Sequence, residues 1–190
     1  QGQVLSLAVA ANGRRLISGG RDNSIRLWDL FIPDPLKQRS PHQVAVTALL
    51  VGPEGSWQAT GSTDKTVRLV PAADGEPMSL GQHADAITTL GTNGTGTLLA
   101  SGDASGRLLL WNPADGQLIG NLGAHKGALV GVAFHPSKPQ MISAGANGTV
   151  KHWTLPLVSP LVLPAHETEI TEVLFGPKGQ LAYVADLATL

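Results

Sequence analysis

The feature that most constrains this 190-residue chain is a repeat of 41 or 42 residues. Three kinds of side chain keep this period: a histidine, a serine or threonine, and a tryptophan ten residues after the hydroxyl. The repeating residues are His42, His83, His125 and His166; Ser18, Thr60, Ser101 and Ser143; and Trp28, Trp111 and Trp153, with Val70 at the remaining tryptophan position. A period of this length predicts a fold of repeated supersecondary units, each of which buries its apolar faces against its neighbours.

Within each repeat the sequence pattern is that of β-strands. Runs such as AVTALLV, QATGS and TVRLV are rich in β-branched and small residues, and turn-forming segments such as GPEGS and PAADGE separate them. Asn147 and Gly148 form a two-residue hairpin signal, because both residue types tolerate a positive φ. We therefore expect an all-β fold with about four strands in each repeat.

Composition argues against several classes of function. Hydrophobic residues make up 42% of the chain and charged residues 14%, which disfavours disorder. The 13 basic residues balance 14 acidic ones without forming a basic run, so nucleic acid is not an expected partner. Because no run of about 18 apolar residues occurs, a membrane is not an expected partner either. The chain has no cysteine, which removes disulfides and thiolate chemistry. No signal peptide or apolar span is visible, so a soluble, cytoplasmic protein is the default and an extracytoplasmic location stays open.

These repeats resemble those of the WD-repeat β-propeller family, since each has a histidine near its start and a Trp-Asp-like pair near its end. Four stretches carry the resemblance: SGGRDNSIRLWD (18–29), TGSTDKTVRLV (60–70), SGDASGRLLLWN (101–112) and SAGANGTVKHWT (143–154). The resemblance covers the whole chain and implies blades at about residues 1–41, 42–82, 83–124 and 125–165, with a partial blade at 166–190.

A closed ring of this family usually has about seven blades, more than this chain can supply. We therefore expect an incomplete ring. Three explanations stay open: a piece of a longer protein, which we favour; a half-ring that another chain closes; and an unusual small ring.

The resemblance further implies a hydrogen-bond relay inside each blade. The tryptophan indole bonds the hydroxyl, the hydroxyl bonds the histidine, and the histidine bonds an aspartate in the turn before the third strand, because buried polar atoms need partners. In the third blade Ser105 stands at the aspartate position, and Asp103, two residues earlier, is a candidate substitute; we expect no blade to be complete. The assigned structural relay residues are Ser18, Asp22, Trp28, His42, Thr60, Asp64, His83, Ser101, Trp111, His125, Ser143, Asn147, Trp153 and His166.

We predict no catalytic, metal-binding or cofactor-binding residue. The relay accounts for four histidines, while His135 and His152 fit no metal-ligand spacing. The glycine-rich segment 91–97 lacks the helix and lysine of a phosphate-binding loop. The strands expected to line the central opening carry only Glu172 as a charged residue. We thus expect no enzymatic activity and no cofactor. The first alternative is a structural propeller domain of a larger bacterial multi-domain enzyme, for example one linked to a haem domain; the second is a propeller hydrolase.

The resemblance implies a scaffold or interaction module with a protein or peptide partner. That partner would bind the loop-bearing top face or the exposed blade edges, and the same or another chain would supply the remaining blades. Most top-face positions carry small residues and lack the aromatic character of binding hot spots, so Arg21 and Glu169 are the leading candidates. The candidate contacts are Arg21, Thr47, Thr63, Thr88, Glu169 and Thr171.

Overall fold

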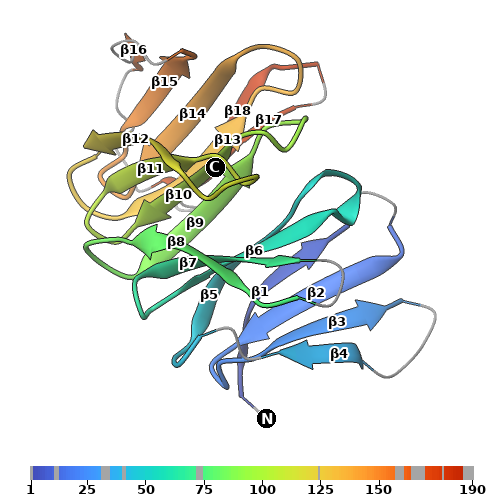
Figure 1. Ribbon diagram of the computed structural model, residues 1–190. Coiled ribbons are helices and arrows are strands. Elements are labelled where there is room, and N and C mark those ends of the chain that lie inside the picture. The colour runs from blue at the N-terminus through green and yellow to red at the C-terminus, as the bar shows by residue number, and fades with distance from the viewer. Residues whose placement is uncertain are drawn as a thin grey trace.

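We describe the protein from a computed structural model, which covers residues 2–10, 13–30, 35–39, 42–71, 75–123, 125–156, 161–163, 170–176 and 178–185. Within these residues the chain forms consecutive antiparallel sheets, most of them four-stranded (Figure 1). No helix in the described part of the chain is long and apolar enough to cross a membrane.

Each sheet is a meander in which successive strands pair with one another. The first sheet holds β1 (Val4–Val9), β2 (Arg15–Gly20), β3 (Ile25–Asp29) and β4 (Pro35–Arg39). The second holds β5 (Val46–Val51), β6 (Trp57–Ser62), β7 (Thr66–Pro71) and β8 (Met78–Gln82), with the short 3₁₀ turn η1 (Pro53–Gly55) between β5 and β6. The third holds β9 (Ile87–Thr92), β10 (Leu99–Asp103), β11 (Arg107–Trp111) and β12 (Leu118–Gly123).

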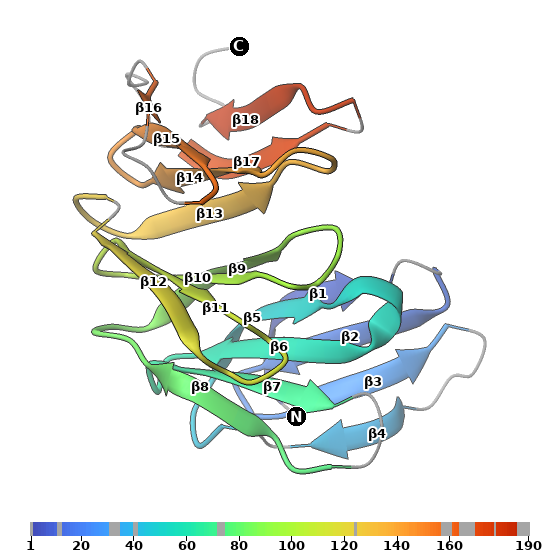
Figure 2. The ribbon, with the colours of Figure 1, turned by 45° about the horizontal axis from the view of Figure 1, so that its top comes forward.

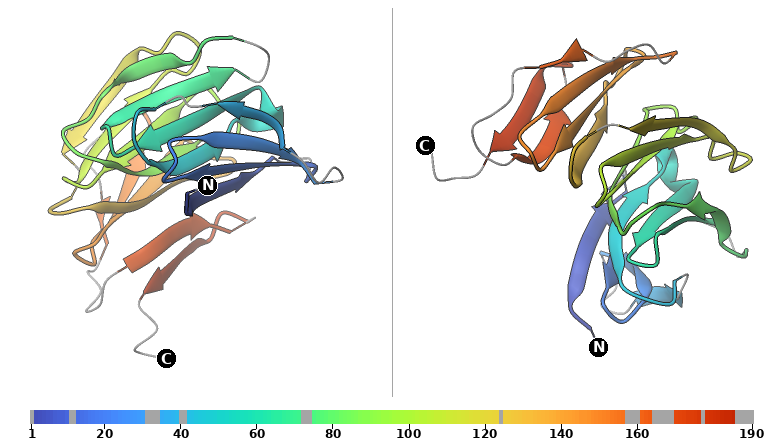
Figure 3. Two further views of the ribbon diagram at one scale, coloured as in Figure 1. Left: turned by 90° about the horizontal axis from the view of Figure 1, so that it is seen from below. Right: turned by 90° about the vertical axis from the view of Figure 1, so that its left-hand side faces the viewer.

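The fourth sheet holds β13 (Leu129–Phe134), β14 (Gln140–Gly145), β15 (Val150–Thr154) and β16 (Leu161–Val162). In the fifth, β17 (Ile170–Phe175) pairs with β18 (Leu181–Ala185). The first strand of each sheet contacts the first strand of the next, so β1, β5, β9, β13 and β17 lie innermost (Figure 2). The sheets follow one another along an arc from β1 to β17 and β18, and the ring is not closed (Figure 3). The prediction of an all-β, incomplete propeller is therefore confirmed.

The hydrophobic core lies between the sheets, where facing strands interdigitate. Leu109 and Trp111 of the third sheet pack on Val67 and Leu69 of the second, and the fourth sheet presents Trp153 to the third in the same way. Each sheet therefore covers its predecessor with the face that bears its tryptophan.

The corresponding face of the first sheet has no sheet before it among the described residues. Leu7 and Val9 of β1 lie on this face, because they pair with Ser18 and Leu16, and Leu16 pairs with Trp28. Leu7 and Val9 are 60% and 58% exposed. In the described structure the first sheet thus exposes to solvent the face that, in later sheets, packs on the preceding sheet.

The turn between the second and third strands has one backbone conformation in the first four sheets. Asn23, Lys65, Gly106 and Gly148 occupy the equivalent position and have φ values of 63°, 69°, 87° and 77°. A left-handed residue at this position lets the chain reverse tightly, and glycine adopts that conformation without steric cost.

Candidate functional site: blade relays and the turn-bearing face

The third sheet contains a complete buried relay. The Trp111 indole N–H donates to Ser101 Oγ at 2.8 Å, and Ser101 Oγ lies 2.7 Å from His83 Nε2. His83 Nδ1 lies 3.0 Å from Asp103 Oδ2. The expectation that no blade would be complete is therefore wrong for this sheet. Asp103 also accepts hydrogen bonds from the backbone N–H groups of Ser105 and Arg107, so it organises the turn from a position two residues before Ser105.

The second sheet keeps the histidine end of the relay and loses the tryptophan end. His42 Nδ1 lies 2.9 Å from Asp64 Oδ2, and His42 Nε2 lies 2.8 Å from Thr60 Oγ1. Val70 is buried at the tryptophan position, where it can offer no donor to Thr60. The Thr66 hydroxyl donates a hydrogen bond to Asp64 Oδ1 at 2.6 Å, which helps to hold the carboxylate beside His42 Nδ1.

The fourth sheet substitutes a threonine for the aspartate contact. Trp153 Nε1 donates to Ser143 Oγ at 2.9 Å, and Ser143 Oγ lies 2.8 Å from His125 Nε2. His125 Nδ1 lies 2.8 Å from Thr149 Oγ1, and the Thr149 hydroxyl bonds Asn147 Oδ1 at 2.8 Å. Asn147 therefore reaches the histidine only through Thr149, a residue that the sequence analysis did not single out.

In the first sheet the Trp28 indole donates to Ser18 Oγ at 2.9 Å. Asp22 accepts from Arg26 Nη2 at 2.8 Å and from Ser24 Oγ at 2.7 Å. Hydrogen bonds from Arg26 and Ser24 hold the pKa of Asp22 well below its usual range. The assigned relay residue His166 lies outside the described residues.

Burial controls the protonation of the relay histidines. It lowers the pKa of His42 and of His83, and hydrogen bonds with Asp64 and Asp103 offset only part of that effect. Burial alone would raise the pKa of each aspartate, but hydrogen bonds from Thr66 to Asp64 and from Ser105 to Asp103 leave both carboxyl groups below their usual pKa. At neutral pH the rings are thus neutral and hydrogen-bonded, which suits a structural role.

His125 gives the fold a pH dependence. Burial, followed by the positive charge of Lys151, lowers the pKa of His125 from 6.5 to about 4. Between these pH values the unfolded chain binds a proton that the folded chain does not, so the free energy of unfolding falls as pH falls. We expect urea unfolding to show lower stability at pH 5 than at pH 7.5. His125→Gln should make that dependence shallower by up to about 1.4 kcal/mol per pH unit. An unchanged slope would contradict the assignment.

Asp64→Ala should destabilise the protein more than Asn147→Ala. Asp64 bonds His42 directly, and its loss leaves the buried imidazole with only the longer contact to the neutral Thr66 hydroxyl at 3.1 Å, at a cost of about 1–3 kcal/mol. Asn147 bonds Thr149, whose hydroxyl still contacts His125 after the substitution. Thermal unfolding of the two variants beside the parent checks this ranking, and equal losses would refute it.

We call the face that carries the turns between the second and third strands of each sheet the turn-bearing face. On this face one backbone hydrogen bond is repeated in four sheets. The N–H groups of Arg21, Thr63, Ala104 and Ala146 donate to carbonyls of the segments that enter β1, β5, β9 and β13, at 2.9, 3.1, 2.9 and 2.9 Å. Arg21 and Thr63 are exposed, so two of the six candidate contacts present side chains to solvent at rigid, equivalent places.

Three other candidates lie on innermost strands, and Glu169 falls outside the described residues. Thr47 Oγ1 donates to the carbonyl of Ile87 at 2.6 Å, and Thr88 Oγ1 donates to the carbonyl of Leu129. Both hydroxyls thus tie one blade to the next. Thr171 is exposed on β17.

The central opening is a cavity of about 670 Å³ between innermost strands of the arc. Its lining includes Ser6, Thr89, Val130 and Thr171, and Glu172 is the ionisable residue in it. Among the described residues no group of three or more His, Cys, Asp or Glu side chains is arranged to hold a metal ion.

Four-stranded antiparallel sheets around a central opening, with a Trp–Ser–His relay inside the blade, define a β-propeller of WD-type blades. The chain belongs to the family described as WD domain, G-beta repeat, whose sequence model matches residues 1–29, 33–70, 76–112 and 116–154.

This chain spans only a small part of the length of the relatives that it matches. It is 26% identical over 151 residues to apoptotic protease-activating factor 1 of Rattus norvegicus, a match that covers 74% of this chain and 12% of that protein. It is 27% identical over 157 residues to cilia- and flagella-associated protein 52 of Chlamydomonas reinhardtii, over 80% of this chain and 25% of that protein. A chain in the crystal structure of the mitotic checkpoint complex matches with a TM-score of 0.85 and 21% identity, over 94% of this chain and 58% of that chain.

Proposed function

We propose that this chain is a non-catalytic scaffold module that binds a protein or peptide on its turn-bearing face. One observation carries the proposal: the same backbone bond holds Arg21, Thr63, Ala104 and Ala146 in four successive sheets, and Arg21 and Thr63 expose their side chains there. Exposed side chains on a backbone held in place suit recognition, because little conformational entropy of the backbone is lost on binding. The matched chain in the mitotic checkpoint complex belongs to a multi-protein assembly, which supports the same class of function.

The buried chemistry of the chain supports a binding role over catalysis. His42, His83 and His125 use both ring nitrogens in hydrogen bonds inside their blades, so none of the three is available to a substrate. A propeller hydrolase would need converging ionisable groups, and Glu172 stands alone in the lining of the central opening. The role as an accessory propeller of a larger bacterial enzyme stays a prediction, as does the exclusion of nucleic acid and membrane partners.

Substitution of Arg21 tests whether the turn-bearing face binds a partner. A pull-down from cell extract should compare the parent with Arg21→Glu, which reverses an exposed charge, and with Lys138→Glu, which reverses an exposed charge between β13 and β14 at the opposite end of the strands. We expect Arg21→Glu to lose at least one partner that the parent and Lys138→Glu both retain. An unchanged set of partners would exclude Arg21 from the binding site. Equal losses in both variants would contradict the assignment of binding to the turn-bearing face.

A further inference from the structure

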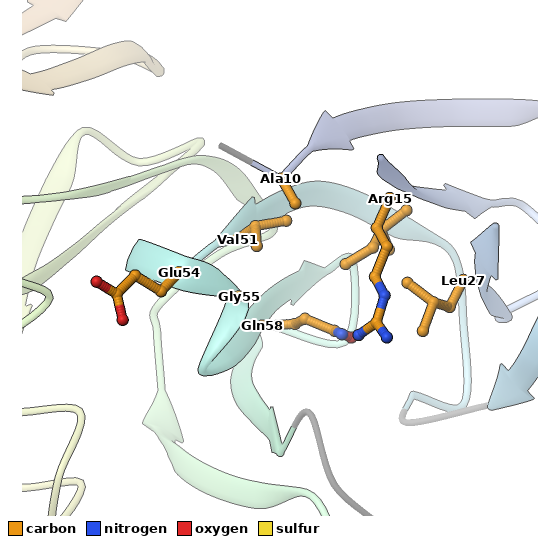
Figure 4. Close-up of a pocket in the computed structure, with 8 residues that line it drawn as sticks. Ala10, Arg15, Leu27, Val51, Glu54, Gly55 and Gln58 are labelled. Carbon is orange, nitrogen blue, oxygen red and sulfur yellow. The ribbon is translucent and has the colours of Figure 1, made fainter. Parts of the chain in front are cut away.

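A small pocket lies between the first and second sheets, at the end of the strands opposite the turn-bearing face. Apolar side chains form part of its walls, and two polar side chains, Arg15 and Gln58, reach into it (Figure 4). We propose that this pocket binds the carboxylate of an acidic side chain presented by a protein partner. The lining consists of Ala10, Arg15, Ile17, Leu27, Val51, Glu54, Gly55 and Gln58.

Gln58 departs from the repeat at this point. It pairs with Val70 in the same register in which Leu16, Leu99 and Met141 pair with a tryptophan in the other sheets. The second blade has therefore exchanged an apolar residue for an amide and the neighbouring tryptophan for a smaller valine. The amide lines the pocket between the two sheets.

The amide of Gln58 and the guanidinium of Arg15 converge without partners among the residues that the structure describes. Gln58 is 9% exposed, and no described residue hydrogen-bonds its side chain. The exposed Arg15 likewise has no ion pair with any described residue, and Figure 4 shows its guanidinium beside the Gln58 amide. Because most of the Gln58 side chain is shielded from water, a hydrogen bond from its amide N–H to a ligand is stronger here than at an open surface.

The acidic residues near the pocket do not fill this role. Glu54, held at a left-handed φ of 56° in η1, directs its carboxylate away from Arg15 (Figure 4). Asp29 pairs across the strands with Arg15, but its carboxylate accepts from Arg14 Nε at 2.8 Å. The pocket thus offers a cation and an amide donor side by side, a combination that matches a carboxylate.

The size of the pocket selects the source of the carboxylate. Its volume of about 30 Å³ exceeds what one water molecule needs but falls far below the several hundred Å³ of a metabolite site. A free carboxylate of few atoms binds weakly, since so few atoms contribute little binding free energy. A carboxylate carried by a protein can add contacts on the surrounding surface, so we assign the site to a protein partner.

Side-chain amide signals of Gln58 in ¹H–¹⁵N spectra test the assignment. The purified protein is titrated with acetyl-Gly-Glu-Gly-amide, with acetyl-Gly-Gln-Gly-amide and with sodium butyrate. We expect the Glu peptide to shift the Gln58 signals with saturation, the Gln peptide to bind at least tenfold more weakly, and butyrate to bind more weakly than the Glu peptide. Equal shifts with the Glu and Gln peptides would overturn the proposal, and tighter binding of butyrate would overturn the protein source.

Two variants separate binding from folding. Gln58→Leu restores the residue type of Leu16 and Leu99, so it should raise Tm by about 2–4 °C while the shifts of neighbouring backbone signals with the Glu peptide are lost. Arg15→Met should weaken binding at least fivefold, whereas Lys126→Met, which removes an exposed charge at the turn-bearing face, should not. Binding that survives both pocket variants would refute the site. The turn-bearing face enters this experiment only through the Lys126→Met control, so the outcome is independent of the pull-down.

Discussion

Gly106→Ala should destabilise the protein far more than Gly127→Ala, although both glycines have almost the same φ, 87° and 89°. A methyl group at Gly106 would lie 2.3 Å from the carbonyl oxygen of His125 and 2.4 Å from that of Gly127. These atoms belong to the backbone that enters β13 and cannot rotate away. At Gly127 a methyl group meets nothing within 4 Å, so that substitution carries only the cost of the left-handed conformation.

The conformational cost alone is about 1 kcal/mol, which sets the expected loss for Gly127→Ala. For Gly106→Ala we expect roughly 3 kcal/mol or more, because the third and fourth sheets must separate locally to admit the methyl group. Chemical unfolding of both variants beside the parent measures the difference. Losses within about 0.5 kcal/mol of each other would show that the contact between the Gly106 turn and the segment before β13 is not as close as described.

The turn position of Gly106 shows what the sequence could and could not supply. The 41- or 42-residue period and the strand-like runs predicted four-stranded sheets correctly, because period and alternation are local properties of the chain. The same period aligns Gly106 with Lys65 and Asn23, which adopt the same left-handed conformation. The clash that distinguishes Gly106 comes from His125 and Gly127, and only the packing of one blade on the next brings these residues together.

The relay illustrates a second limit. Alignment by period placed Ser105 and Asn147 at the aspartate position, whereas Asp103 and Thr149 contact the histidines. A two-residue displacement within a tight turn moves a carboxylate or hydroxyl only a short way, so several positions can reach the same ring nitrogen. The sequence does contain a usable signal, since Ser24, Thr66, Ser105 and Thr149 each follow an Asp or Asn by two residues and bond its side chain. Hydroxyls at this spacing typify Asx-type turns.

Ser101→Ala should cost about 2–4 kcal/mol of unfolding free energy, because one hydroxyl serves two buried partners. Ser101 Oγ accepts from the Trp111 indole at 2.8 Å and bonds His83 Nε2 at 2.7 Å. Neither ring can recover a partner from water, since both are buried between the second and third sheets. Ser18→Ala is the matched control: Trp28 is only partly buried, and its indole can bond water after the change, so we expect a loss of roughly 1 kcal/mol.

A double substitution separates the two lost bonds. Trp111→Phe removes the indole N–H, so adding Ser101→Ala to it should cost less than Ser101→Ala costs in the parent, by about 1 kcal/mol or more. The remaining loss then belongs to His83, which still lacks a partner for Nε2. Denaturant unfolding of the parent, both single variants and the double variant measures the coupling. Strict additivity would mean that the indole and the imidazole do not depend on the same hydroxyl, and a loss at Ser18 equal to that at Ser101 would mean that burial does not set the strength of the relay.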